Sequence, residues 1–167
     1  MEQEKTCRRQ DLAVRDTHKG RSVFTKRAFK RNEFIIEFAG DVYTRDQYLQ
    51  LMTFEDNHFI QIDTNLFQGP SDAPDNCINH SCNPNCGFHY TGRRPLLYSI
   101  RDIGEGEEIT FDYSTTMDEG FWEMECLCGE KNCRGIIRDF RHLPIPLQKK
   151  YRLLGIVPDF ILKTFSR

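Results

Sequence analysis

The sequence lacks a long apolar run and a surplus of charge of either sign. No stretch approaches the ~18 consecutive apolar residues that a membrane-spanning helix requires, so no membrane partner is expected. The 23 lysine and arginine residues nearly balance the 25 aspartate and glutamate residues, which leaves a formal net charge of −2. General affinity for nucleic acid depends on a basic excess, so direct binding to nucleic acid is not expected either.

A secretory signal and a disulfide framework are also missing from the pattern. Residues 1–16 are charged and have no apolar signal-peptide core, so we expect a protein made in the cytosol. The seven cysteines cannot all pair, and disulfides are rare in that reducing compartment. Clustered thiols there indicate a metal site instead. The cysteines form two clusters and one outlier: Cys77, Cys82 and Cys86; Cys126, Cys128 and Cys133; and Cys7.

The length and composition are those of one domain with a single core. The chain has 167 residues, of which 38% are hydrophobic, and 13 phenylalanines stand against one tryptophan. Most of the chain has the pattern of short strands joined by turns. We expect strands within residues 22–44, 58–63, 87–101 and 109–113, with a buried run at 34–38 and a hairpin turn at 91–94.

Helical signals are sparse and short. Thr44 and Gln47 have the spacing of a capping box, which predicts a helix over residues 45–53. The tail predicts two further helices, over residues 146–154 and 158–165. The tail is expected to pack on the domain, and a dimer formed through it is the alternative. Residues 66–76 are rich in turn formers and favour a loop, and residues 1–16 favour a loosely held arm.

Residues 126–133 have the sequence CLCGEKNC, which places three thiols within eight residues. Such a loop can wrap one tetrahedral zinc ion, but a closed structural site needs a fourth ligand. The upstream candidates for that ligand are Cys77, His80, Cys82 and Cys86. The spacing alone leaves this choice open.

A second dense polar run, INHSCNPNC, covers residues 78–86. It offers zinc ligands, a nucleophile formed by His80 and Cys82, or a polar loop with buried thiols. A reactive cysteine needs an electropositive environment and a third orienting group, and nothing nearby supplies one. The nucleophile is therefore disfavoured, and a zinc ligand and a polar loop with buried thiols both stay open.

Five motifs follow one another along the chain: KGRSVF (19–24), EFAGD (37–41), INHSCNPNC (78–86), GEEITFDY (106–113) and CLCGEKNCRG (126–135). In this order they resemble the SET domain followed by its zinc-binding post-SET segment, over about residues 17–137. Members of that family transfer methyl groups from S-adenosylmethionine to protein lysines, most famously in histone tails.

The resemblance implies a mostly β fold, the β-clip of several small sheets, with short helices at the C-terminal end. It also implies a pseudoknot, in which the segment holding Asn79 and His80 is threaded past the strand that ends at Tyr113. The chain then divides into an N-terminal arm (1–16), the SET domain (17–116), a post-SET zinc lobe (117–137) and a C-terminal helical extension (138–167).

The resemblance further implies roles for individual residues. Tyr113 matches the active-site tyrosine, and Phe111 matches an aromatic residue of the lysine channel. The residues that match the cofactor site are Gly20, Arg21 and Ser22 at the methionine end, Asn79 and His80, and Trp122 near the adenine. The residues that match the four zinc ligands are Cys82, Cys126, Cys128 and Cys133, so that Cys86 is expected to be merely packed.

Several positions depart from the family pattern. Ser22 stands where a second glycine is usual, and Phe38 stands where many members have tyrosine. Asn76-Cys77 replaces the usual Arg-Phe. His58 lies near a position often held by an active-site tyrosine, although a plain strand histidine is favoured. Phe111 in place of tyrosine favours room for di- or trimethylation.

The sequence therefore predicts an S-adenosylmethionine-dependent protein-lysine N-methyltransferase with one structural zinc and a histone tail as the first substrate. The alternatives are a lysine of a non-histone protein, including a host protein, and a non-catalytic zinc- and cofactor-binding interaction module. The expected compartment is the nucleus in a eukaryote, and the cytoplasm or a host cell otherwise. Five acidic residues either suit a basic peptide or form a solvated face: Glu105, Glu107, Glu108, Asp118 and Glu119.

Overall fold

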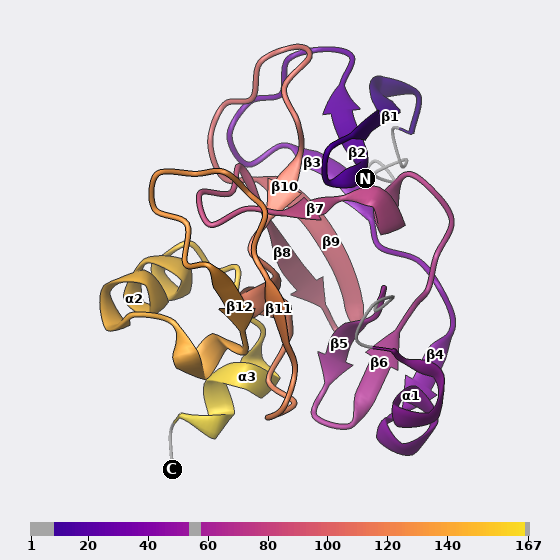
Figure 1. Ribbon diagram of the computed structural model, residues 1–167, viewed down its shortest axis with the longest axis vertical. Helices are drawn as coiled ribbons and strands as arrows, with labels where there is room; N and C mark the ends of the chain where they lie inside the picture. The colour runs from indigo at the N-terminus through magenta and orange to yellow at the C-terminus, as the bar shows by residue number, and fades with distance from the viewer. Residues whose placement is uncertain (1–8, 54–57, 166–167) are drawn as a thin grey trace, which may run out of the picture.

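A computed structural model describes residues 9–53 and 58–165 and arranges them in five small β-sheets with three short α-helices (Figure 1). The mostly β prediction is confirmed. The central sheet has the strand order β3 (Phe34–Glu37), β9 (Arg94–Ser99), β8 (Cys86–Thr91). Strands β8 and β9 form the predicted hairpin, and Gly92 makes the tight turn with a φ of 63°. Ile35 and Ile36 of β3 are fully buried, as their apolar run predicts.

The second three-stranded sheet has the order β4 (Val42–Thr44), β6 (Leu66–Gln68), β5 (Ile60–Asp63). Helix α1 (Arg45–Leu51) follows β4, and the predicted capping box of Thr44 and Gln47 is present at its start. The loop prediction for residues 66–76 is wrong at its first three residues. They form β6 because Phe67 is fully buried and the strand is hydrogen-bonded to β4 on one side and β5 on the other.

The chain start is also more ordered than predicted. The expectation of a loosely held arm over residues 1–16 is wrong for residues 12–16, which belong to β1 (Leu12–Thr17) and pair antiparallel with β2 (Gly20–Thr25). Leu12 is buried, and Asp11 in the preceding turn η1 (Arg9–Asp11) forms an ion pair of 2.8 Å with Arg27. Residues 1–8 lie outside the described part of the chain.

Two very short strands bring distant motifs together. Strand β7 (Asn79–His80) pairs in parallel with β10 (Thr110–Phe111), so that Asn79 lies opposite Thr110 and His80 opposite Phe111. The predicted strand over residues 109–113 is therefore shorter than expected. Tyr113 begins the 3₁₀ helix η3 (Tyr113–Thr116) because the Asp112 side chain accepts a hydrogen bond from the Ser114 amide and caps it.

The lobe that carries the last three cysteines is here called the cysteine lobe (residues 117–137). Its strand pair is β11 (Glu123–Glu125) and β12 (Ile136–Arg138), and β12 ends one residue beyond the lobe. The C-terminal segment (residues 138–165) follows with η4 (Phe140–His142), α2 (Ile145–Leu153) and α3 (Asp159–Thr164). Figure 1 shows α2 and α3 on one side of the molecule and α1 on the other. None of the described helices has the length and apolar character needed to cross a bilayer.

The C-terminal segment packs on the domain, as the default prediction had it. Tyr151, Ile156 and Ile161 are buried in a cluster of their own. Ile156 covers Gly87 of β8 so closely that a Cβ atom at position 87 would lie 2.5 Å from the Ile156 Cγ2. Gly87 is therefore the residue that lets this segment lie against the central sheet.

Candidate functional site

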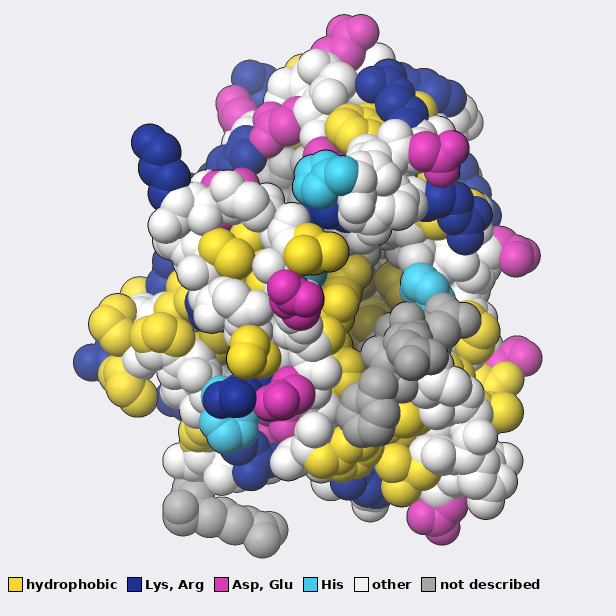
Figure 2. All heavy atoms as spheres, viewed as in Figure 1, with side chains coloured by type: hydrophobic (Ala, Val, Ile, Leu, Met, Phe, Trp, Pro, Cys, Tyr) yellow, Lys and Arg dark blue, Asp and Glu magenta, His cyan; other side chains and the backbone are white. Residues whose placement is uncertain are grey.

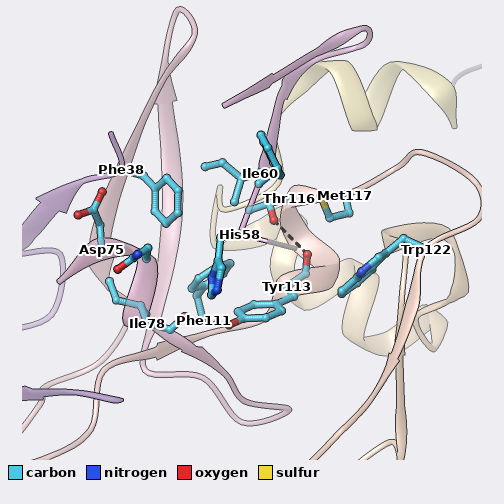
Figure 3. Close-up of a pocket in the computed structure, with 12 residues that line it drawn as sticks. Phe38, His58, Ile60, Asp75, Ile78, Phe111, Tyr113, Thr116, Met117 and Trp122 are labelled. Carbon is cyan, nitrogen blue, oxygen red and sulfur yellow. Dashed lines mark hydrogen bonds between the residues drawn. The ribbon is translucent and has the colours of Figure 1, made fainter. Parts of the chain in front are cut away.

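An apolar pocket opens beside the end of β10. It contains about 420 Å³ of empty space, part of which is open solvent. Figure 2 shows a hollow with apolar side chains in its floor, between the β11–β12 side and the sheet of β4, β5 and β6. Figure 3 shows the side chains that line it. The lining residues are Phe38, His58, Phe59, Ile60, Asp75, Asn76, Ile78, Phe111, Tyr113, Thr116, Met117 and Trp122.

Tyr113 and Phe111 lie side by side in the wall of the pocket. Their ring centroids lie 4.8 Å apart, and Phe111 is 3% exposed. The Tyr113 hydroxyl donates a hydrogen bond of 2.9 Å to the carbonyl oxygen of Ile78, which also lines the pocket. Burial raises the pKa of this hydroxyl above its ordinary value of about 10, so it stays protonated at neutral pH. Its oxygen keeps its lone pairs for a group in the pocket.

Trp122 and His58 also belong to this pocket. Trp122 is buried, and its ring centroid lies 6.5 Å from that of Tyr113. His58 lines the pocket from the residue before Phe59, as Figure 3 shows, although its position next to β5 predicted a plain strand histidine first. Met117 and Thr116 complete the rim from the segment after Tyr113, and no pattern in the sequence indicated them.

A second group of predicted residues lies on the other side of β7. The Asn79 side-chain amide donates to the carbonyl oxygen of Arg21 at 3.0 Å and to the Ser22 hydroxyl at 2.7 Å. Gly20 has a φ of 89°, which glycine adopts without strain, and no heavy atom lies within 4 Å of where its Cβ would be. The open space beside Gly20 and the amide of Asn79 fit a polar ligand that approaches the backbone closely.

His80 connects the two groups. Its Nδ1 accepts a hydrogen bond of 3.2 Å from the Tyr113 amide, which places the ring proton on Nε2, 3.3 Å from the Cys82 sulfur. Burial lowers the pKa of His80 to about 4, although the nearby Asp112 carboxylate opposes that shift, so the ring is neutral near pH 7. Ile78 lines the pocket, while its neighbour Asn79 lies against Gly20, Arg21 and Ser22, here called the glycine turn.

The four predicted metal ligands come together in one cluster. The sulfur atoms of Cys82, Cys126, Cys128 and Cys133 all lie within 4.8 Å of one another. A tetrahedral zinc–thiolate site, with zinc–sulfur bonds of about 2.3 Å, separates its sulfurs by about 3.8 Å, so this donor set fits zinc. Cys77 and Cys86 do not belong to the cluster. Burial raises the pKa of the Cys82 thiol to about 11, so the thiol resists ionisation at neutral pH. A zinc ion bound there would stabilise the thiolate and favour loss of the proton.

Backbone groups support the same cluster. The amide of Arg134 donates to the Cys82 sulfur at 3.4 Å, and the amide of Gly135 donates to the Cys133 sulfur at the same distance. The Asn132 side chain donates to the Cys82 carbonyl oxygen at 2.9 Å and ties the cysteine loop to the chain after β7. Amide donors of this kind stabilise thiolates. The backbone of the loop therefore favours metal binding in addition to the four thiols.

Three residues that the sequence did not single out meet beside the site. Arg134 donates two hydrogen bonds of 2.7 Å to the carboxylate of Asp112, and Tyr151 of α2 donates a third of 2.9 Å. The available signal was a charged residue between Phe111 and Tyr113 in a buried segment, because a buried carboxylate requires partners. The identity of those partners depends on the tertiary fold.

The acidic residues proposed to suit a basic peptide do not form one open surface. Glu107 pairs with Arg101, Glu108 pairs with Lys19, and Asp118 pairs with Arg141. Glu119 is 6% exposed. Glu105 lies exposed in the turn before Glu107. Four of these five carboxylates are therefore in ion pairs or in the interior, and they do not form an open acidic surface around the pocket.

Comparison with known proteins gives consistent relatives. The SET domain family model matches residues 20–114. The histone-lysine N-methyltransferase ash1 of Drosophila melanogaster is 31% identical over 141 residues, which is 77% of this chain and 6% of ash1. The chain therefore spans only a small part of that relative.

Two solved structures are similar to this chain. The methyltransferase domain of human histone-lysine N-methyltransferase SETMAR has a TM-score of 0.66 at 25% identity, over 77% of this chain and 58% of that one. KRYPTONITE in complex with mCHG DNA and SAH has a TM-score of 0.58 at 25% identity, over 76% of this chain and 29% of that one. The family match covers more than half of the 167 residues, on the motifs that build the pocket and the glycine turn. The chain belongs to the SET domain family.

Proposed function

We propose that this chain is an S-adenosylmethionine-dependent protein-lysine N-methyltransferase and that a histone tail is its substrate. The observation that carries the proposal is the position of Tyr113. Its hydroxyl is fixed on the Ile78 carbonyl where the apolar pocket meets the segment of Asn79 and His80. A substrate lysine entering from the pocket and a methyl donor lying on Asn79 would meet at that hydroxyl.

The apolar wall of the pocket accounts for how the amine becomes reactive. A lysine in water has a pKa of about 10.4, so holding it neutral near pH 7 costs about 4–5 kcal/mol. Phe111, Trp122 and Ile78 surround the space beside Tyr113 with buried apolar groups, and such desolvation lowers the pKa of an entering amine. The amine gives its proton to water, and the Tyr113 oxygen then orients the lone pair towards the donor.

The glycine turn and β7 are the proposed donor site. S-adenosylmethionine supplies a sulfonium-bound methyl group when it is bound. Gly20, Arg21 and Ser22 provide backbone and hydroxyl groups beside open space, and the Asn79 amide lies against them. His80 is neutral and its position is fixed by Tyr113, so it adds no charge that would repel a sulfonium. SAH, the demethylated product of this donor, is bound in the KRYPTONITE complex.

The four-cysteine cluster is the proposed zinc site. The ligands are Cys82, Cys126, Cys128 and Cys133. Zinc there stabilises the cysteine lobe and fixes Cys82, two residues after His80, without taking part in the reaction. Trp122 of the same lobe lies against Tyr113, so the metal supports one wall of the pocket from a distance.

The histone assignment is supported by the similarity to ash1, a histone-lysine N-methyltransferase. Phe111 and Phe38 place no hydroxyl in the pocket at their positions, which favours room for more than one methyl group.

Calorimetric titration with S-adenosylmethionine tests the donor site. The wild type should bind the cofactor, and Asn79→Ala should weaken binding by about 10-fold or more because it removes a directed polar contact. Asn83→Ala, four residues further along the same run, should bind as the wild type does. A wild type that binds no cofactor would support a non-catalytic interaction module instead.

A further inference from the structure

We propose that Tyr151 of helix α2 is a positioning residue of the methyl-transfer site, acting through Asp112 on Tyr113. The proposal rests on the proposed function, and it assigns a role to the C-terminal segment, which lies outside the family match over residues 20–114. The Tyr151 hydroxyl donates a hydrogen bond of 2.9 Å to Asp112 Oδ2. Both residues are buried, with exposed fractions of 0% for Tyr151 and 1% for Asp112.

Asp112 stands in the sequence between Phe111 and Tyr113, two aromatic residues that line the pocket. Its carboxylate does not line the pocket and accepts four hydrogen bonds. Oδ1 accepts from Arg134 Nη2 at 2.7 Å and from the Ser114 amide at 3.1 Å, while Oδ2 accepts from Arg134 Nη1 at 2.7 Å and from Tyr151 at 2.9 Å. These bonds come from three different groups, the Arg134 guanidinium, the Ser114 amide and the Tyr151 hydroxyl, so the carboxylate has one orientation that satisfies them all.

The orientation of Asp112 determines the backbone of Tyr113. Through the Ser114 amide, the carboxylate caps the 3₁₀ helix that Tyr113 begins. The Tyr113 amide in turn donates to His80 Nδ1 at 3.2 Å, and Asp112 Oδ1 lies 3.5 Å from the same nitrogen. A rotation of the Asp112 side chain would therefore move the Tyr113 amide, its ring and the hydroxyl on Ile78 together.

Tyr151 is suited to this role because its own position is rigid. It is fully buried in the core of the C-terminal segment, and that segment is fixed on β8 by Ile156 over Gly87. Arg134 links Asp112 to the cysteine loop, next to Cys133, whereas Tyr151 links it to helix α2. The hydroxyl is thus the contact that ties the catalytic tyrosine to the scaffold behind it.

The experiment compares Tyr151→Phe with Gln148→Met. The first removes one hydroxyl from Asp112 and keeps the ring. The second lies one turn earlier on α2, is 7% exposed and loses hydrogen bonds only to the carbonyl oxygens of Leu143 and Arg141. Both changes cost the C-terminal segment a buried polar contact, so their effects on the melting temperature should be similar.

Steady-state methyl transfer should separate them. We expect kcat of Tyr151→Phe to fall by about 10-fold, because the reacting groups are misaligned, with KM for peptide and cofactor unchanged within about twofold. Gln148→Met should keep the wild-type kcat. A Tyr151→Phe variant with wild-type kcat, or an equal fall in kcat for both variants, would overturn the proposal.

Amide NMR supplies a readout that does not depend on activity. The Tyr113 and Ser114 amide resonances should shift in Tyr151→Phe and stay in place in Gln148→Met. If the wild type methylates nothing, the proposed function fails, and these shifts still decide whether Tyr151 positions Tyr113. Unshifted Tyr113 and Ser114 resonances in Tyr151→Phe would refute the positioning role on their own.

Discussion

Arg134 binds the carboxylate of Asp112 through two parallel hydrogen bonds of 2.7 Å, and the Asp112 side chain is fully buried. Arg134 directly follows Cys133, the last residue of the four-cysteine cluster, and Asp112 directly precedes Tyr113. This ion pair therefore joins the cysteine lobe to the segment that carries Tyr113, and its loss should affect both.

Arg134→Met should lower the free energy of unfolding by about 3–5 kcal/mol, because it leaves a buried carboxylate with neutral donors alone. Urea denaturation of the zinc-loaded protein measures the change. Arg138→Met is the matched control, since Arg138 forms an ion pair of 2.9 Å with Glu123 and both side chains are about half exposed. The control should lose less than about 1 kcal/mol. Similar small losses in both variants would contradict the importance of the Asp112 pair.

Cys82→Ser should lose zinc. The other three thiols of the cluster remain, but a closed tetrahedral site needs all four, and metal affinity contributes directly to folding. Metal analysis should give about one zinc per chain for the wild type and a marked fall in the variant, and a chelator should lower the wild-type melting temperature. Cys86→Ser, four residues away and outside the cluster, should keep its zinc. Unchanged zinc in Cys82→Ser would rule out the four-cysteine site.

Glu119 should make stability depend on pH. Burial raises its pKa to about 7 from an ordinary 4.5, and the neighbouring Asp139 carboxyl acts in the same direction. Between about pH 4.5 and 7 the folded state holds a proton that the unfolded state has released, so the free energy of unfolding falls as pH rises through that window. Glu119→Gln has no carboxyl group at this position to titrate, so its free energy of unfolding should not fall in this way. It should be more stable than the wild type by about 1–3 kcal/mol at pH 8 and equal to it below about pH 4.

Thermal or urea unfolding across that pH range measures the difference. Glu125→Gln makes the same chemical change at an exposed side chain and should follow the wild type at every pH. If the wild-type and Glu119→Gln curves run parallel from pH 4 to pH 8, the Glu119 carboxyl does not titrate as the structure implies.

Local patterns predicted those parts of the fold in which neighbouring residues determine the outcome. The hairpin of β8 and β9 follows from turn residues between alternating runs, and α1 follows from the capping box of Thr44 and Gln47. Only part of the cysteine cluster could be predicted from local sequence. Three thiols in eight residues indicated a metal, while the spacing alone could not choose among the four candidates for the last ligand.

The rest depends on contacts between distant segments. Strand β7 has two residues and pairs with β10 about 30 positions later, so its strand character exists only in the folded chain. Leu12 is the one buried residue of β1. The other residues of the strand are exposed or partly exposed, so the sequence pattern resembles that of a loosely held arm. The bond from Tyr151 to Asp112 joins positions 39 residues apart, and no local pattern marks either residue for the other.

Transfer of a labelled methyl group from S-adenosylmethionine to histone tails, by the wild type and by Tyr113→Phe, tests the central claim most directly. The tails are supplied with lysine and with arginine at the same positions. We expect label on lysine alone, and a fall in the methyl-transfer rate of about 100-fold or more in Tyr113→Phe, which should bind the cofactor as the wild type does. Equal labelling by the two proteins would contradict it, and so would a cofactor-bound wild type that labels no lysine.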